Sequence, residues 1–187
     1  MQLNWTGERL VPRVMKKDRA VVKEHFARYN WVLQFCKNKI VLDAASGSGY
    51  GINLISSVAS EAIGLDVAPD AIKYSREKYT KPRFGICDLE KGYTIKSDIV
   101  ISFETIEHLS DPNEFLASVK KNCRETFIFS IPVNLPGEFH KVVYSIEEIK
   151  ALISKHFDNV EYLCQEGEVI KPIINDAKFL IGIAKLK

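Results

Sequence analysis

The stretch Val41–Gly51, which reads VLDAASGSGYG, constrains the fold more than any other part of the sequence. An apolar run ends on an acid, Asp43, and passes directly into a turn of small residues. A buried parallel strand gives way to a helix in this manner when a ligand lies across the end of the strand. The alternate glycines of the turn allow positive φ angles and let the backbone approach a ligand closely. We therefore expect a ligand site where this strand ends.

The spacing of these glycines is G-x-G-x-G, which differs from the G-x-G-x-x-G of a pyrophosphate cradle. An acid directly before the turn would also repel a phosphate group. Asp43 suits a ligand with a cationic or hydroxyl-rich part instead. These two features disfavour an NAD-dependent oxidoreductase.

Composition sets wide limits on the class of protein. The 187 residues fit one domain, which we divide into an N-terminal arm and helix (1–37) and a core (38–187). The hydrophobic fraction of 46% is ordinary for a globular chain, and the net charge of +2 gives no sign of nucleic-acid binding. Four scattered cysteines and the lack of an apolar leader or span predict a reduced, cytoplasmic protein without a membrane segment. One basic cluster (Arg13, Lys16, Lys17, Arg19 and Lys23) is either a solvated face or a contact for an anionic substrate.

Strand and helix patterns alternate along the chain. A helix is expected from a cap at Asp18 to about Cys36, with a buried stripe of Val22, Phe26, Tyr29, Leu33 and Cys36. Strands are expected at 40–43, 61–66, 83–87, 98–103, 126–131, 160–164 and 179–185. Helices are expected at 50–57, 69–79, 112–121 and from a Ser145–Glu148 capping box to about 156. This alternation predicts an α/β fold whose parallel sheet is covered on both faces.

Acids follow four of these strands, at Asp43, Asp66, Asp88 and Glu104. Ligands of such sheets bind beyond the carboxyl ends of the strands, so these acids lie where a ligand should. Asp66 can accept hydrogen bonds from ribose hydroxyls, or can cap the helix that begins near residue 69. Asp88 can accept from an adenine amine, or can be a loop acid without such a role.

These segments together resemble a known motif series. The segments are Asp43-x-Ala-x-Gly-x-Gly49, Gly64-Leu-Asp66, Cys87-Asp88-Leu89 and Asp98-Ile-Val-Ile-Ser-Phe-Glu104. They look like the motifs of class I S-adenosylmethionine-dependent methyltransferases from about residue 38 onward. The resemblance implies a Rossmann-like, seven-stranded, mostly parallel sheet with an antiparallel last strand. It also implies S-adenosyl-L-methionine as cofactor and S-adenosyl-L-homocysteine as product. Ala45 departs from the pattern, since many members have glycine there.

The same resemblance assigns the cofactor contacts. The glycine turn (Ala45, Gly47, Gly49) and Asp43 would hold the methionine part, and Asp66 the ribose. Val67, Asp88 and Leu89 would surround the adenine, and Ser102 or Phe103 would flank the methionine. An acid-rich site also suits a cofactor that carries a sulfonium and an ammonium group but no phosphate.

Glu104-Thr-Ile-Glu107-His108 is the second sharp feature, and its spacing places the three ionisable groups on one side of a helical turn. A later loop of Pro132–Tyr144 adds His140. In one interpretation a histidine is a general base and the glutamates position the acceptor. In another, Glu104, Glu107, His108 and His140 bind a divalent metal that activates a hydroxyl. This pattern resembles small-RNA 3′-terminal 2′-O-methyltransferases, and some quinone-biosynthesis O-methyltransferases. In a third, these groups only form ordinary bonds around the cofactor.

The N-terminal segments Trp5-Thr-Gly-Glu-Arg9 and Glu24-His25-x-x-Arg28-Tyr29 resemble a bacterial subgroup of small methyltransferases linked to glycan pathways. This resemblance implies that the arm folds over the cofactor, with Arg28 or Tyr29 at its carboxylate. The alternative is a packed helix in which Arg28 pairs with Glu24 at i, i+4.

We therefore expect a methyltransferase that acts on a hydroxyl or amine of a small polar acceptor, with a sugar or nucleotide-sugar first. The alternatives are a metal-assisted RNA 2′-O-methyltransferase and a non-catalytic cofactor-binding partner subunit. The sequence leaves the oligomeric state open.

Overall fold

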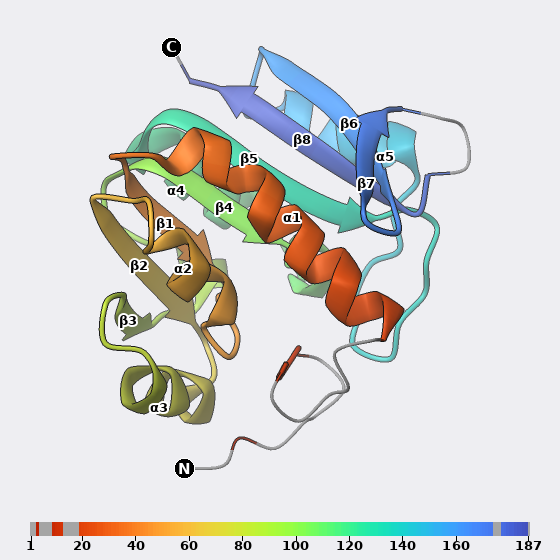
Figure 1. The fold of residues 1–187 in the computed structure, drawn as a ribbon. Coiled ribbons are helices and arrows are strands. Elements are labelled where there is room, and N and C mark those ends of the chain that lie inside the picture. The colour runs from red at the N-terminus through yellow and green to blue at the C-terminus, as the bar shows by residue number, and fades with distance from the viewer. Residues whose placement is uncertain (1–2, 4–8, 13–18, 174–176, 187) are drawn as a thin grey trace.

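The computed structural model describes residues 3, 9–12, 19–173 and 177–186, and its centre is one eight-stranded sheet (Figure 1). The strand order is β3-β2-β1-β4-β5-β8-β6-β7. The strands are β1 (Ile40–Ala44), β2 (Glu61–Asp66), β3 (Arg83–Ile86), β4 (Ser97–Phe103), β5 (Cys123–Pro132), β6 (Val160–Glu166), β7 (Val169–Pro172) and β8 (Phe179–Lys185). The helices are α1 (Ala20–Cys36), α2 (Tyr50–Ile55), α3 (Pro69–Lys78), α4 (Asn113–Asn122) and α5 (Ile146–Ser154), with short 3₁₀ helices η1 (Leu89–Lys91) and η2 (Ile106–His108).

Strands β1 to β5 are parallel, and β8 runs antiparallel to both β5 and β6. The predicted Rossmann-like sheet with an antiparallel last strand is confirmed. The predicted strand number of seven is wrong, because β7 pairs with β6 as an added antiparallel edge strand. β7 has only four residues and ends on Pro172, so it is too short to show a clear alternation, and proline is tolerated at a sheet edge.

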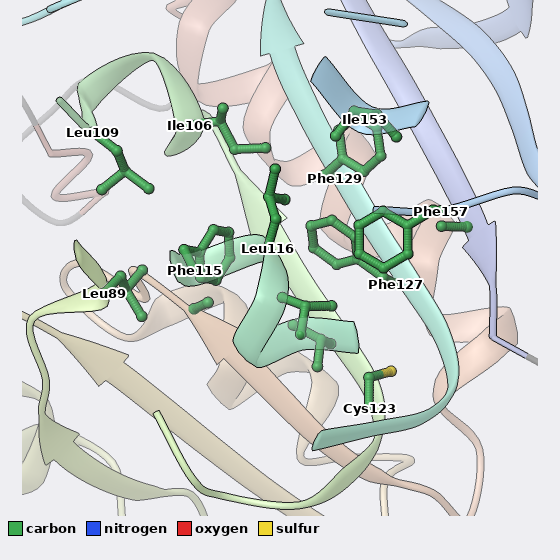
Figure 2. Close-up of a cluster of buried hydrophobic side chains, with 14 of the residues drawn as sticks. Leu89, Ile106, Leu109, Phe115, Leu116, Cys123, Phe127, Phe129, Ile153 and Phe157 are labelled. Atoms are coloured by element: carbon green, nitrogen blue, oxygen red, sulfur yellow. The ribbon is translucent and has the colours of Figure 1, made fainter. Parts of the chain in front are cut away.

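Helices cover both faces of the sheet. α1 crosses the face seen at the front of Figure 1, and α4 and α5 lie behind the sheet. On the first face, Val32 and Cys36 of α1 pack with residues of α2 and β1. On the other, Phe115 and Leu116 of α4 pack against Phe127 of β5 (Figure 2). Each large apolar side chain buried in this way contributes about 1.5–3 kcal/mol.

The buried face of α1 differs from the predicted stripe. Val22, Tyr29 and Cys36 are buried as expected, but Phe26 and Leu33 are only partly buried. Their places are taken by residues that include two charged side chains, Glu24 and Arg28, both buried. Apolar periodicity could not reveal this face because charged side chains are buried only where they have partners, and these partners are distant in sequence. The predicted cap, Asp18, lies outside the described residues.

The capping box of α5 is confirmed: the Ser145 hydroxyl accepts from the Glu148 backbone N–H, and the Glu148 carboxylate accepts from that of Ser145. None of the helices in the described part of the chain is long and apolar enough to cross a bilayer.

Two substitutions in the turn after β1 should change stability in opposite directions. Ala45 adopts φ 63°, a left-handed conformation that costs a non-glycine residue about 1–2 kcal/mol. Ala45→Gly should therefore raise the free energy of unfolding by about 1 kcal/mol in urea denaturation. Gly49→Ala should lower it by more than about 1 kcal/mol, since φ is 76° and the new Cβ would lie 2.6 Å from the Ser75 hydroxyl. Equal effects of the two changes would contradict the described turn.

Candidate active site

The site lies at the carboxyl edge of the parallel strands. β1 lies between β2 and β4, so the order of strands along the chain reverses at β1. Such a switch point leaves a crevice beyond the strand ends because the connections depart in opposite directions. Asp43 near the end of β1 is paired in register with Gly64 of β2 and Ile101 of β4.

The turn after β1 is held by its own backbone. Ser46 N donates to Leu65 O at 2.7 Å, and Gly49 N donates to Ser46 O at 2.9 Å. Ala45, Gly47 and Gly49 all have positive φ. Ala45 stands where many class I methyltransferases have glycine, and it adopts the left-handed conformation at a cost in backbone strain. Among the described residues, a Cβ added at Gly47 would meet only Arg9 Cβ at 3.8 Å, so this position leaves room for a ligand.

Asp43 is completely buried. The Tyr29 hydroxyl donates to its Oδ2 at 3.0 Å, and Oδ1 has no hydrogen-bond partner among the described residues. Burial raises the pKa of Asp43 to about 8; the Tyr29 hydrogen bond opposes this rise, and the charge of Asp66 adds to it. A buried acceptor without a donor is destabilising by about 1–3 kcal/mol, so Oδ1 fits a ligand that brings an N–H or O–H group.

Asp66 ends β2 and organises the next stretch of backbone. Its Oδ2 accepts from Gly47 N at 2.8 Å and its Oδ1 from Ala68 N at 2.9 Å. Val67 is 63% exposed, and Ile86, which is paired with Asp66 at the end of β3, is 58% exposed. Two exposed apolar side chains beside a carboxylate suit a flat ring joined to a sugar. Sequence reasoning missed Ile86, since only the pairing of β2 with β3 brings it beside Asp66.

Asp88 and Leu89, which were expected to contact the adenine, differ in their surroundings. Asp88 accepts from Glu90 N at 3.1 Å and pairs with Lys91 Nζ at 3.0 Å, and the Lys91 bond lowers its pKa. Leu89 is 5% exposed and packs in the core with Phe115 (Figure 2), so the exposed apolar side chain of this region is that of Ile86.

Ser102 and Phe103 end β4. Ser102 is buried, and its Oγ has no partner among the described residues. The Phe103 ring lies edge-on to the Tyr29 ring, with centroids 5.1 Å apart. Phe103 thus contacts the tyrosine that donates to Asp43, whereas the alternation of side chains along β4 directs Ser102 to the other face of the sheet.

Glu104 is held by α1. Arg28 Nη2 donates to Glu104 Oε1, and His25 Nε2 lies 3.1 Å from the same oxygen. Burial alone would raise the pKa of Glu104, but the charges and hydrogen bonds of Arg28 and His25 outweigh it and hold this pKa far below its usual range. Of the two alternatives for Arg28, the pairing with Glu24 is wrong, since Glu24 pairs instead with Lys178 at 2.8 Å. Tyr29 contacts Asp43, as described above.

Glu107, His108 and His140 converge. Each offers one ligand atom, and these atoms lie within 4.8 Å of one another. Glu107 is 1% exposed, and neither carboxylate oxygen has a hydrogen-bond partner in the part of the chain that the structure describes. Burial raises its pKa to about 8. Of the four residues grouped by sequence, the structure brings these three together and places Glu104 before η2, bound to α1.

The two histidines are oriented by backbone carbonyls. His108 Nδ1 lies 2.9 Å from Phe139 O, and His140 Nδ1 lies 2.9 Å from Leu135 O. A carbonyl only accepts, so Nδ1 of each ring carries the hydrogen and Nε2 is the basic nitrogen of the neutral ring. The loop itself is anchored where Lys141 N and Val142 N donate to Glu107 O.

The N-terminal motif 5–8 and the basic residues 13, 16 and 17 lie outside the described residues, as do 174–176. Arg19 and Lys23 of the basic cluster are exposed.

The buried carboxylate of Asp43, the glycine turn after β1 and the acid at the end of β2 agree with the class I S-adenosylmethionine-dependent methyltransferases that the motifs resemble. Residues 36–178 match the family described as "Methyltransferase domain", and the chain belongs to it. A probable S-adenosylmethionine-dependent methyltransferase of Mycolicibacterium smegmatis is 30% identical over 133 residues, which cover 67% of this chain and 49% of that protein. The chain spans about half the length of the curated relatives it matches.

Two solved structures share the fold at low identity. A possible histamine N-methyltransferase from Thermotoga maritima superimposes with a TM-score of 0.75 at 14% identity, covering 96% of this chain and 97% of that one. The methyltransferase domain of bacterial CtHen1 has a TM-score of 0.70 at 17% identity, covering 87% of this chain and all of that one.

The buried state of Asp43 predicts a pH dependence of stability. Its folded pKa of about 8 lies above the ordinary value, so its contribution is fully present below about pH 4 and is lost as pH rises through 8. Asp43→Asn should flatten the fall of unfolding free energy between pH 5 and 8 by up to about 1.4 kcal/mol per pH unit in urea denaturation.

Asp98→Asn is the matched control for this prediction. The pKa of Asp98 is lowered, because its hydrogen bonds with Ile40 and Arg124 outweigh burial, so this change should leave the slope above pH 5 intact. If the unfolding free energies of wild type and Asp43→Asn changed in parallel with pH, the raised pKa of Asp43 would be contradicted.

Proposed function

We propose that this methyltransferase transfers a methyl group to a hydroxyl of a small polar acceptor, with a sugar or nucleotide-sugar the first choice. The observation that carries this proposal is the convergence of Glu107, His108 and His140 just beyond β4, beside the cofactor edge. The cofactor supplies an electrophilic methyl group on a sulfonium centre. The protein must then align the acceptor, exclude water and accept its proton.

The cofactor would be held by residues from three strand ends. Asp43 Oδ1 would accept from the ammonium of the methionine part, and Asp66 would accept from the ribose hydroxyls. Val67 and Ile86 would flank the adenine. The unpartnered oxygen of Asp43 and the exposure of the two apolar side chains support this placement.

Proton acceptance would fall to an imidazole. Both rings present Nε2 as the basic nitrogen, because Nδ1 of each is engaged by a carbonyl. In its ionised form, which predominates above its raised pKa of about 8, the buried carboxylate of Glu107 would stabilise the imidazolium that forms. An amine acceptor could lose its proton to the same groups. Leu135, Phe139 and Val143 of the same loop are exposed and would offer apolar surface to one face of a ring.

A second candidate is metal-assisted methylation of a ribose 2′-hydroxyl in RNA. Two histidines and a buried carboxylate that has no hydrogen-bond partner among the described residues form a donor set that divalent metals accept, and His108 Nε2 lies 4.0 Å from Glu107 Oε1. Glu107, His108 and His140 would hold the ion, without Glu104. The net charge of +2 offers little attraction for an RNA backbone. A non-catalytic cofactor-binding subunit is the third candidate.

The ribose assignment predicts the effect of one substitution. Asp66→Ala should weaken the binding of S-adenosylhomocysteine by about 1–3 kcal/mol in calorimetry, because it removes a charged acceptor from two hydroxyls. Asp98→Ala is the control: Asp98 also accepts from a backbone N–H, that of Ile40, but at the start of β4. It should lower stability without changing this affinity. Unchanged affinity in folded Asp66→Ala would overturn the assignment.

The acceptor step can be tested with radiolabelled S-adenosylmethionine and a panel of nucleotide-sugars, free sugars and a 3′-terminal RNA oligonucleotide. With EDTA-treated protein, we expect methylation of a sugar hydroxyl, and His140→Ala should lower the rate 10²–10⁴-fold, the range for loss of a general base. Methylation of the RNA alone, only after Mn²⁺ is added, would establish the second candidate. In that case Mn²⁺ binding should be lost in Glu107→Gln and retained in Glu104→Gln. Full activity of a native complex that contains His140→Ala would favour the non-catalytic role.

A further inference from the structure

The side chain of Glu104 is fixed at one oxygen only. Both of its side-chain partners, Arg28 Nη2 and His25 Nε2, meet Oε1, and the structure records no partner for Oε2 among the described residues. The side chain is 21% exposed, so it is not sealed in the core. Its backbone is equally constrained, since φ is 51° and the N–H donates to Ser130 O at 3.0 Å.

Arg28 is built into this arrangement. It is completely buried, and its guanidinium lies 4.5 Å from the centre of the Phe179 ring and 5.9 Å from that of Phe103. Its Nε and Nη1 have no partner among the described residues, so Glu104 is the ionic partner that the structure shows for this charge. Rings on β4 and β8 therefore hold the cation that holds Glu104.

His25 links the same oxygen to the cofactor turn. Its Nδ1 lies 2.9 Å from the Tyr50 hydroxyl, and Tyr50 is the first residue of α2, directly after Gly49. Nε2 faces the Glu104 carboxylate and donates to it, so Nδ1 accepts from the Tyr50 hydroxyl when the ring is neutral and donates to it when the ring is protonated. A chain of hydrogen bonds thus runs from the start of α2 through His25 to Glu104.

We propose that Arg28 and His25 are positioning residues, which fix Oε1 of Glu104 and leave Oε2 to accept a hydrogen bond from the methyl acceptor. This inference rests on the proposed hydroxyl methylation and extends it. The acceptor then carries a second donor group, held by Glu104, beside the hydroxyl that reacts. Sequence resemblance had offered Arg28 for the cofactor carboxylate, and the contact with Glu104 supports a different role.

The charges around Glu104 support this role. Arg28 and His25 of α1 lower its pKa, and the nearby ionisable groups on the other elements are Tyr50 of α2 and Glu107 of η2. With Arg28 intact, this lowered pKa keeps Glu104 ionised at neutral pH. An ionised carboxylate can only accept hydrogen bonds, so Glu104 would favour substrates that carry a hydrogen-bond donor.

The test follows the carboxyl ¹³C resonance of Glu104 in glutamate-labelled protein with S-adenosylhomocysteine bound, assigned by its loss in Glu104→Gln. In wild type this shift should stay constant from pH 4.5 to 8. In Arg28→Met it should titrate with a midpoint above 4.5, because burial then dominates. Arg28→Lys, which keeps a cation, should restore the flat profile. His25→Phe removes one donor with less disturbance and should show a smaller rise if Arg28→Met does not fold.

Glu24→Gln is the matched control. Glu24 lies one turn earlier on α1 and also crosses to a distant residue, Lys178, but it does not touch Glu104. It should leave the resonance flat. A wild-type resonance that titrates at an ordinary pH, or one unchanged in Arg28→Met, overturns the positioning role.

Kinetics with the best acceptor of the panel complete the test. Arg28→Met should lower kcat at least tenfold, with S-adenosylhomocysteine affinity within twofold of wild type, and Arg28→Lys should recover part of the loss. An unchanged kcat overturns the inference. If wild type methylates no hydroxyl while the resonance behaves as expected, the proposed function fails and the Arg28–His25–Glu104 contact stands without its catalytic role.

Discussion

The burial of the Arg28 charge is the constraint on which the arrangement of the site depends. A guanidinium removed from water is strongly destabilising unless an opposite charge lies beside it. Glu104 supplies that charge from the end of β4, and the Phe179 and Phe103 rings lie close to the cation. The contact ties α1 to the carboxyl edge of the sheet, so a helix that precedes the first strand becomes part of the site.

The same helix brings Tyr29 to Asp43 and His25 to Glu104, so neighbouring residues of α1 serve two strand ends. Near them lie buried acceptors for which the described residues provide no hydrogen-bond donor, namely Asp43 Oδ1 and both oxygens of Glu107. Buried polar atoms are nearly always paired in a finished structure. The position of these carboxylate oxygens at the carboxyl edge of the parallel strands is a physical reason to expect ligands there, and it agrees with the family to which the chain belongs.

Much of the fold could be predicted because its determinants are local. The strand that ends at Asp43, its turn, and the Ser145 capping box depend on consecutive residues, and all were confirmed. The buried face of α1 was predicted poorly, since Phe26 and Leu33 have the right hydrophobicity while Arg28 depends on a partner 76 residues away. β7 was not predicted, because a strand of four residues at the edge of the sheet is too short to show a clear hydrophobic pattern.

The sequence by itself determined the order of most strands and helices and the acids at four strand ends, because short-range patterning and backbone requirements act along the chain. The class of cofactor followed from the resemblance of these segments to the methyltransferase motifs. Tertiary structure alone decided which ionisable groups work together. The loop after β5 brings His140 close to Glu107 and His108, and Glu104 lies apart from them in contact with Arg28. The reason is energetic: each buried charge is placed where a compensating group lies in space, and the sequence positions of the two groups do not reveal it.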